Sequence, residues 1–109
     1  MAFKKIEHYP ELYIRVSLAC LMLSHPARLK IIAQLMKQGP SHVKALSVEH
    51  PLAPATVSQH LEHLRVDRMV DAECMYPWIK YSINRDTLRQ VREDINRFFD
   101  ILEEDIEEG

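Results

Sequence analysis

The stretch APATVSQHLEHLRVDRMVDAE, residues 53–73, carries the strongest structural signal in the chain. Val57, Leu61 and Leu64 recur at three- and four-residue spacing, which predicts a helix with one apolar face from about residue 54 to 66. The residues after it alternate between apolar and polar, which is typical of a half-buried strand. Because the outer face of the helix is polar, the helix either covers an ordinary core or lies on another molecule.

Three more helices are predicted upstream of this stretch. Residues 10–23 are apolar on nearly all sides, and a small domain can rarely bury such a helix alone, which indicates a partner chain. Residues 24–39 form a second helix with Ser24 as its N-cap, and residues 41–50 form a short third helix with Ser41 as its N-cap. A turn with two prolines then leads to the helix of the quoted stretch.

Downstream, two alternating runs around the turn MYPW predict a β-hairpin over residues 69–83. Asn84 then caps a last helix, which extends to about residue 104. The order of elements predicts a helix-turn-helix over residues 41–66, followed by the hairpin as a wing. The predicted fold is therefore mainly α with a small β-hairpin, a single winged helix-turn-helix domain over residues 1–109.

The bulk composition suits one domain and gives no global reason to expect a nucleic-acid partner. The chain has 109 residues, 47% of them hydrophobic, and a formal net charge of -2. Any basic surface must therefore be local. Two cysteines, no apolar leader and no apolar run long enough to span a bilayer predict a cytoplasmic protein with reduced thiols and no membrane partner.

Three segments carry a resemblance to a known family: LSHPARLKIIAQLM (23–36), LAPATVSQHLEHLRVDRMV (52–70) and YSINRDTLRQV (81–91). In this order and spacing the chain resembles the ArsR/SmtB-type winged-helix repressors of bacteria and archaea, over roughly residues 10–103. The resemblance implies a transcriptional repressor, of its own or a neighbouring operon, that occupies a double-stranded DNA operator. An inducer, often a metal or a reactive sulfur or oxygen species, would release it.

The resemblance also implies a homodimer whose interface is made by the first and last helices, about residues 10–23 and 85–104. This arrangement would explain why the first helix is apolar all round. The residues expected in that interface are Leu12, Val16, Ala19, Leu21, Ile95, Phe98, Phe99 and Leu102.

The resemblance and the helical wheel together place the DNA contacts on the quoted helix and around it. The candidates on the helix are Thr56, Ser58, Gln59, His60 and His63, and the candidates for phosphate contact are Lys44, Arg65, Arg68 and Lys80. Gln59 can pair with the edge of an adenine through two hydrogen bonds. His60 lies beside the inner stripe, so a packing or capping role is the alternative for it.

The chain departs from the family pattern at several positions. Ala53 stands where a capping Ser or Thr is usual, and Met69 is read as standing at the usual glycine. The wing has Tyr76 and Trp78 near its tip, and Lys80 is its one cation. Weak basic character predicts modest DNA affinity with a shallow dependence on salt.

The family's sensor sites are not matched, so the sequence predicts no metal site and no cofactor. The positions of the thiolate metal site hold His42 and Lys44, and the last helix offers Asp86 but no histidine. Neither cysteine falls where thiol-sensing relatives carry theirs; Cys20 is expected to be a buried small hydrophobe, whereas Cys74 could be exposed. A thiol-based redox sensor and an organic inducer of unknown identity remain alternatives.

Two other function classes are alternatives to DNA binding: an enzyme and a module for protein contacts. An enzyme is not expected, because the chain has no glycine-rich phosphate loop, no nucleophile elbow and no HExxH motif. A winged helix used only for protein contacts is the stronger rival, since the acidic balance and the aromatic wing both favour it. Salt-dependent binding to a palindromic promoter fragment would separate the two.

Overall fold

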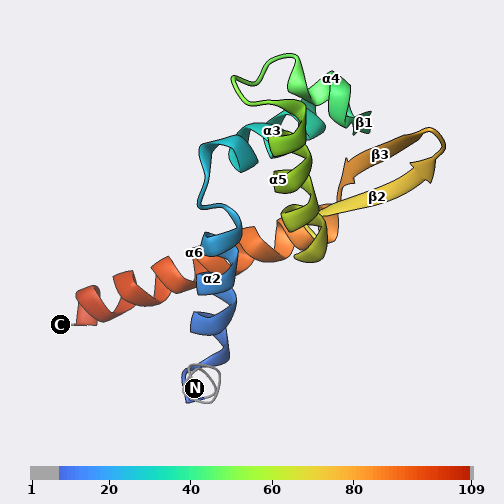
Figure 1. Cartoon of the computed structure of the whole chain (residues 1–109). Coiled ribbons are helices and arrows are strands. Elements are labelled where there is room, and N and C mark those ends of the chain that lie inside the picture. The colour runs from blue at the N-terminus through green and yellow to red at the C-terminus, as the bar shows by residue number, and fades with distance from the viewer. Residues whose placement is uncertain (1–7, 109) are drawn as a thin grey trace.

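The computed structural model describes residues 8–108 and has the predicted order of helices, with one additional short strand (Figure 1). The elements are α2 (Glu11–Met22), α3 (Pro26–Gln38), β1 (Ser41–His42), α4 (Val43–Ser47), α5 (Pro54–Val66), β2 (Val70–Met75), β3 (Trp78–Ile83) and α6 (Arg85–Glu108). The prediction of a mainly α fold with a small β-hairpin is confirmed.

The core lies where α3, α4 and α5 meet the base of the hairpin. Its fully buried side chains come from each of these elements and include Ile31, Leu46, Val57, Leu61, Leu64, Met69 and Val70. Burial of each such side chain contributes about 1.5–3 kcal/mol. The apolar stripe predicted for α5 is therefore the face that fixes this helix, and its opposite face is left outward.

The sheet has three antiparallel strands in the order β1-β3-β2, and β1 was not predicted. Ser41 pairs with Tyr81 and His42 pairs with Lys80, so the residue expected to cap α4 lies in a strand instead. His42 takes over the cap, because its Nδ1 accepts a hydrogen bond from the backbone N–H of Ala45 at 3.4 Å. The prediction for Ser41 is wrong because pairing with a distant strand satisfies its backbone.

Of the two other predicted N-caps, the one for α3 is wrong and the one for α6 is confirmed. The N-cap of α3 is His25 rather than Ser24: His25 Nδ1 accepts from the backbone N–H of Ala27 at 3.0 Å, while the Ser24 hydroxyl donates back to the Leu21 carbonyl at 2.7 Å. The cap predicted for the last helix is confirmed, since Asn84 Oδ1 accepts from the N–H of Thr87 at 3.1 Å.

The turn between α5 and β2 corrects the alignment with the family's glycine. Arg68, not Met69, has the left-handed backbone, with φ of 62°. Counted from Leu64, the family pattern L-x-x-x-G-L-V also places its glycine at Arg68. Met69 is fully buried, so it fills the apolar position that follows the glycine.

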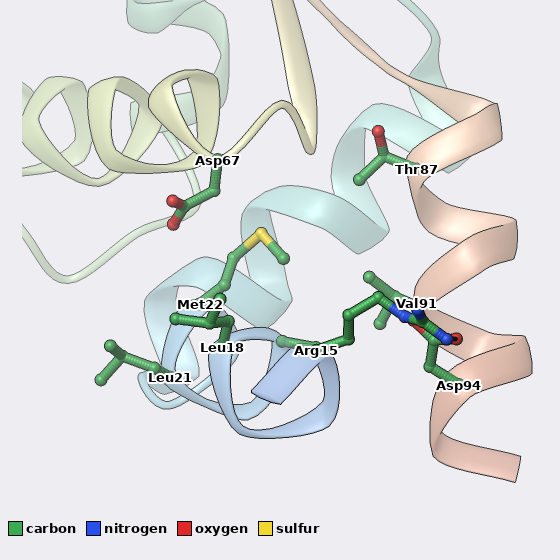
Figure 2. A pocket seen from close by; sticks show the side chains of 9 residues that line it. Arg15, Leu18, Leu21, Met22, Asp67, Thr87, Val91 and Asp94 are labelled. Carbon is green, nitrogen blue, oxygen red and sulfur yellow. Dashed lines mark hydrogen bonds and ion pairs between the residues drawn. The ribbon is translucent and has the colours of Figure 1, made fainter. Parts of the chain in front are cut away.

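The two outer helices, α2 and α6, pack against each other away from the wing (Figure 1). Figure 2 shows Arg15 of α2 reaching Asp94 of α6, and the guanidinium donates two hydrogen bonds of 3.0 and 3.2 Å to the buried carboxylate. Ala19 is 4% exposed within the subunit, so it is already covered before any partner arrives. Cys20, expected to be buried, is exposed on α2.

Much of the apolar surface predicted for the outer helices lies open in the single chain. Leu21 is 66% exposed and Phe99 is 57% exposed, while Leu12, Val16, Ile95 and Phe98 are half-buried and Leu102 is 40% exposed. Phe98 packs edge-on against Tyr13, with ring centroids 5.7 Å apart. Among the described residues no single helix is long and apolar enough to cross a membrane; α2 and α3 meet those criteria only as a pair bent by 89°.

Candidate nucleic-acid interface

The outward face of α5 presents most of the residues predicted to read DNA. Gln59 and His63 are exposed, and Thr56 and Ser58 are half-buried beside them. The helix begins at Pro54 without a side-chain cap, because Ala53 has no group to supply one. A missing cap costs about 1 kcal/mol, so the packed inner face carries the stability of this helix.

The predicted phosphate contacts fall into two groups on either side of α5. Lys44 and Ser58 line one groove of about 470 Å³, together with Pro54 and the wing residues Trp78 and Tyr81. Arg65 and Arg68 line a second concavity where α5 meets β2, with Asp71 beside them. Lys80 is exposed on β3.

Arg65 is already engaged within its own helix. Its Nε donates to Glu62 Oε2 at 3.0 Å, and this hydrogen bond lowers the pKa of the Glu62 carboxyl. Both side chains are about half exposed, so the pair adds little to stability. For phosphate binding, however, Glu62 competes for the guanidinium, and Arg68 and Lys44 are the better-placed cations.

His60 turns toward α3 rather than outward. Its Nδ1 accepts a hydrogen bond from Arg28 Nε at 3.2 Å, and its ring lies against that of His25 with centroids 4.4 Å apart. Burial, followed by the positive charge of nearby groups, lowers the pKa of His60. These contacts correspond to the packing role that the sequence left open for His60.

The wing is anchored to the helix-turn-helix by an aromatic stack that the sequence pattern did not reveal. The Trp78 indole stacks on the His42 imidazole, with centroids 5.0 Å apart and an interplanar angle of 23°. Tyr76, at the tip, is 94% exposed. The pairing of β1 with β3 brings these two rings together, and only that long-range register could have predicted it.

The structure places both residues that the resemblance aligned with a thiolate metal site. His42 caps α4 and supports Trp78, and Lys44 is exposed. Within residues 8–108, no three His, Cys, Asp or Glu side chains gather closely enough to hold a metal ion. Cys20 and Cys74 are both exposed, on α2 and β2 respectively.

A family model supports this assignment of the helix-turn-helix. Residues 25–72 match the model described as "Bacterial regulatory protein, arsR family". This part of the chain is therefore similar to the helix-turn-helix of that family. The match begins at the cap of α3 and ends in β2, so it includes the whole of α5 and its outward face.

Solved structures extend the likeness to the outer helices of the chain. An ArsR-like transcriptional regulator from Rhodococcus sp. RHA1 is 17% identical with a TM-score of 0.72, over 86% of this chain and 88% of that one. A "possible transcriptional regulator for arsenical resistance" is 23% identical with a TM-score of 0.69, over 84% and 95%. NolR from Sinorhizobium fredii is 25% identical with a TM-score of 0.61, over 80% and 87%.

No curated protein sequence matches the chain. The chain has the fold of these solved transcription regulators.

Proposed function

We propose that this ArsR-type protein is a dimeric, sequence-specific DNA-binding repressor that controls its own or a neighbouring operon in the cytoplasm. One face of α5 is a fully buried apolar stripe, and the opposite face is polar and includes Gln59 and His63. This division is the observation that carries the proposal. The helix has 13 residues and is about 20 Å long, which suits a major groove about 12 Å wide.

Sequence reading is assigned to the outward face of α5. The amide of Gln59 has the donor and acceptor pattern that matches N6 and N7 of adenine. The hydroxyls of Thr56 and Ser58 suit a phosphate or either kind of base, and His63 lies one turn beyond Gln59 on the exposed side. His60 is assigned a supporting role, because it holds α5 against α3 through its hydrogen bond from Arg28.

Phosphate binding is assigned to the cations that flank α5. Lys44 and Lys80 approach from α4 and the wing, and Arg68 from the far end of α5, with Arg65 available when it leaves Glu62. The acidic net charge of -2 opposes this local set. Since each phosphate contact adds about -0.9 to the slope of log K against log salt, a shallow slope of a few units per subunit is expected.

The dimer is proposed from the open apolar surface of α2 and α6. Leu21, Phe99 and Leu102 are exposed in the single chain, and contiguous apolar surface on a small domain normally meets a partner. A second copy seated there would present two α5 helices about a two-fold axis. Such a dimer reads a palindromic operator with half-sites about one helical turn apart.

Selection from a random duplex library, followed by binding measured by fluorescence anisotropy, tests the proposal. Gln59→Ala should reduce discrimination between the selected site and its mutated version, at a cost of about 1–3 kcal/mol. Lys44→Ala should weaken binding to all sequences alike and reduce the salt slope by about one. Arg92→Ala, an exposed cation on α6, is the matched control and should change neither.

Failure to enrich any duplex at low salt would contradict DNA binding and favour the rival module for protein contacts. The proposal also holds that the family's metal sites are absent from this repressor. Added Zn²⁺ is therefore expected to leave affinity for the selected duplex unchanged, and metal-induced release would contradict that part of the proposal alone.

A further inference from the structure

Two histidines lie where the outward-facing helix α5 meets the start of α3, and each accepts a hydrogen bond through an unprotonated nitrogen. His25 Nδ1 accepts the backbone N–H of Ala27 at 3.0 Å, and His60 Nδ1 accepts Arg28 Nε at 3.2 Å. The two rings lie 4.4 Å apart at 45°. A doubly protonated imidazole has no acceptor, so neither hydrogen bond survives protonation of its ring.

We propose that the His25–His60 pair is a proton-sensitive latch, which holds α5 against α3 when neutral and releases it in mild acid. The effect on DNA binding rests on the proposed function, whereas the effect on the fold does not. Release would loosen the support behind the DNA-reading face and lower affinity for the operator.

Arg28 is the centre of the latch. Besides its hydrogen bond to His60, its Nη1 donates to the carbonyl of Met22 at 3.4 Å, at the end of α2. One guanidinium therefore joins α2, α3 and α5. A proton on His60 would replace this acceptor with a second positive charge facing Arg28 at hydrogen-bond distance.

The charged groups around the latch oppose a further positive charge. The groups that act on His60 are His25, Arg28, His63 and His50, and each of them lowers its pKa in addition to the larger effect of burial. His25 caps the N-terminal end of α3 beside His60. The carboxylate of Glu49 is near His50. It accepts a hydrogen bond from Gln34 Nε2 at 3.4 Å.

A third histidine, His50 in the connection between α4 and α5, also has a lowered pKa. His50 is buried, and its Nε2 lies 2.7 Å from Gln34 Oε1. Burial and then Lys30 lower its pKa, while Glu49 opposes them. Since His50 and His60 bind protons less readily in the folded chain than in the unfolded chain, stability is full above about pH 6.5 and is lost as the pH falls below it.

The experiment uses the double variant His25→Asn/His60→Asn. The Oδ1 of asparagine takes the place of histidine Nδ1, so the acceptors remain but no longer titrate. Urea unfolding at fixed protein concentration is followed at pH 7.5 and 5.5. The unfolding constant of the natural protein should rise about tenfold in acid, and that of the double variant only about threefold through His50.

His63→Asn is the matched control, because the His63 side chain is exposed on the same helix and takes no part in the hydrogen bonds of His25, His60 and Arg28. It should retain the tenfold rise. An equal acid response in the double variant and the natural protein would overturn the latch. If the double variant does not fold, imidazole NMR titration of the natural protein decides: His60 must titrate below the ordinary histidine value of about 6.5, and an equal or higher midpoint would overturn the proposal.

Binding to the selected duplex separates the latch from the proposed function. Affinity should fall about tenfold from pH 7.5 to 5.5 in the natural protein and less in His25→Asn. A rise in affinity on acidification, as added positive charge alone would cause, overturns the regulatory consequence. If no duplex binds at pH 7.5, the proposed function fails while the urea measurements still decide the latch.

Discussion

Arg68 holds a backbone conformation that its own side chain makes unfavourable. With φ of 62° it lies in the left-handed region, where a residue with a Cβ costs about 1–2 kcal/mol relative to glycine. The turn is required because Met69 and Val70 must enter the core directly after α5. An arginine retained at such a position is consistent with its proposed use as a phosphate contact.

Replacement of Arg68 tests both the backbone strain and the proposed phosphate contact. Arg68→Gly should raise the free energy of unfolding in urea by about 1 kcal/mol, because it removes the backbone strain. Arg68→Ala keeps the Cβ and should show no such gain. Both variants should weaken binding to all duplexes by a similar factor. Equal stabilities of the two variants would argue against strain at this turn.

At the scale of elements, the two faces of α5 differ: one packs into the core and the other is exposed. Val57, Leu61 and Leu64 are fully buried, while Gln59 and His63 are open to solvent. Neither face depends on a side-chain cap, since Ala53 supplies none. Stability and recognition should therefore respond to different substitutions on the same helix.

Leu61→Ala and Gln59→Ala make this separation measurable. Leu61→Ala should destabilise the protein by about 2–5 kcal/mol in urea unfolding, because it leaves a cavity among α3, α4 and α5. Gln59→Ala should stay within about 0.5 kcal/mol, as exposed substitutions usually do, yet reduce DNA discrimination. A large stability loss in Gln59→Ala would mean that this face is sealed inside the assembly.

The contact between α2 and α6 depends on the Arg15–Asp94 pair. Asp94 is buried and also accepts a hydrogen bond from Gln90 at 3.0 Å, whereas Arg15 is partly open and bonds Glu11 as well. The hydrogen bond with Asp94 raises the pKa of Arg15, so the guanidinium stays charged.

A double-mutant cycle on this pair should give strongly non-additive effects. Arg15→Leu should lower the urea midpoint, because it leaves the buried carboxylate without its cation. Adding Asp94→Leu should recover part of the loss, since an apolar pair replaces an unmatched charge. Additive losses would show that the two side chains act independently.

At the scale of the whole molecule, the proposed DNA-reading part and the proposed dimer part lie in different regions of the subunit. Figure 1 shows the wing close to β1 and α4, whereas α2 and the C-terminal part of α6 lie away from the wing. The exposed apolar residues of α2 and α6 are not part of the buried core. Two-fold pairing through them would leave both α5 helices free.

Charge placed on the open apolar surface should dissociate the dimer. Leu21→Asp with Phe99→Asp should shift the protein to a monomer in sedimentation velocity, because each buries an unpaired carboxylate in the interface. Tyr76→Asp, on the 94% exposed wing tip, is the control and should stay dimeric. A natural protein that sediments as a monomer at micromolar concentration would contradict the proposed interface.

The sequence by itself determined the features that depend on neighbours along the chain. The apolar spacing predicted α5 from Pro54 to Val66, and the alternating runs predicted the wing. Asn84 was identified as a cap because capping needs only the next three residues. The same local patterns carried the resemblance to the ArsR family.

Only the tertiary structure decided the features that join residues far apart in the chain. Strand β1, the stack of His42 on Trp78 and the contact of His60 with Arg28 each need a partner more than thirty residues away. The burial of Asp94 against Arg15 spans 79 residues. Hydrophobic periodicity records which face is buried, but it does not record what that face meets, because burial is non-directional whereas hydrogen bonds and ring contacts require a particular partner.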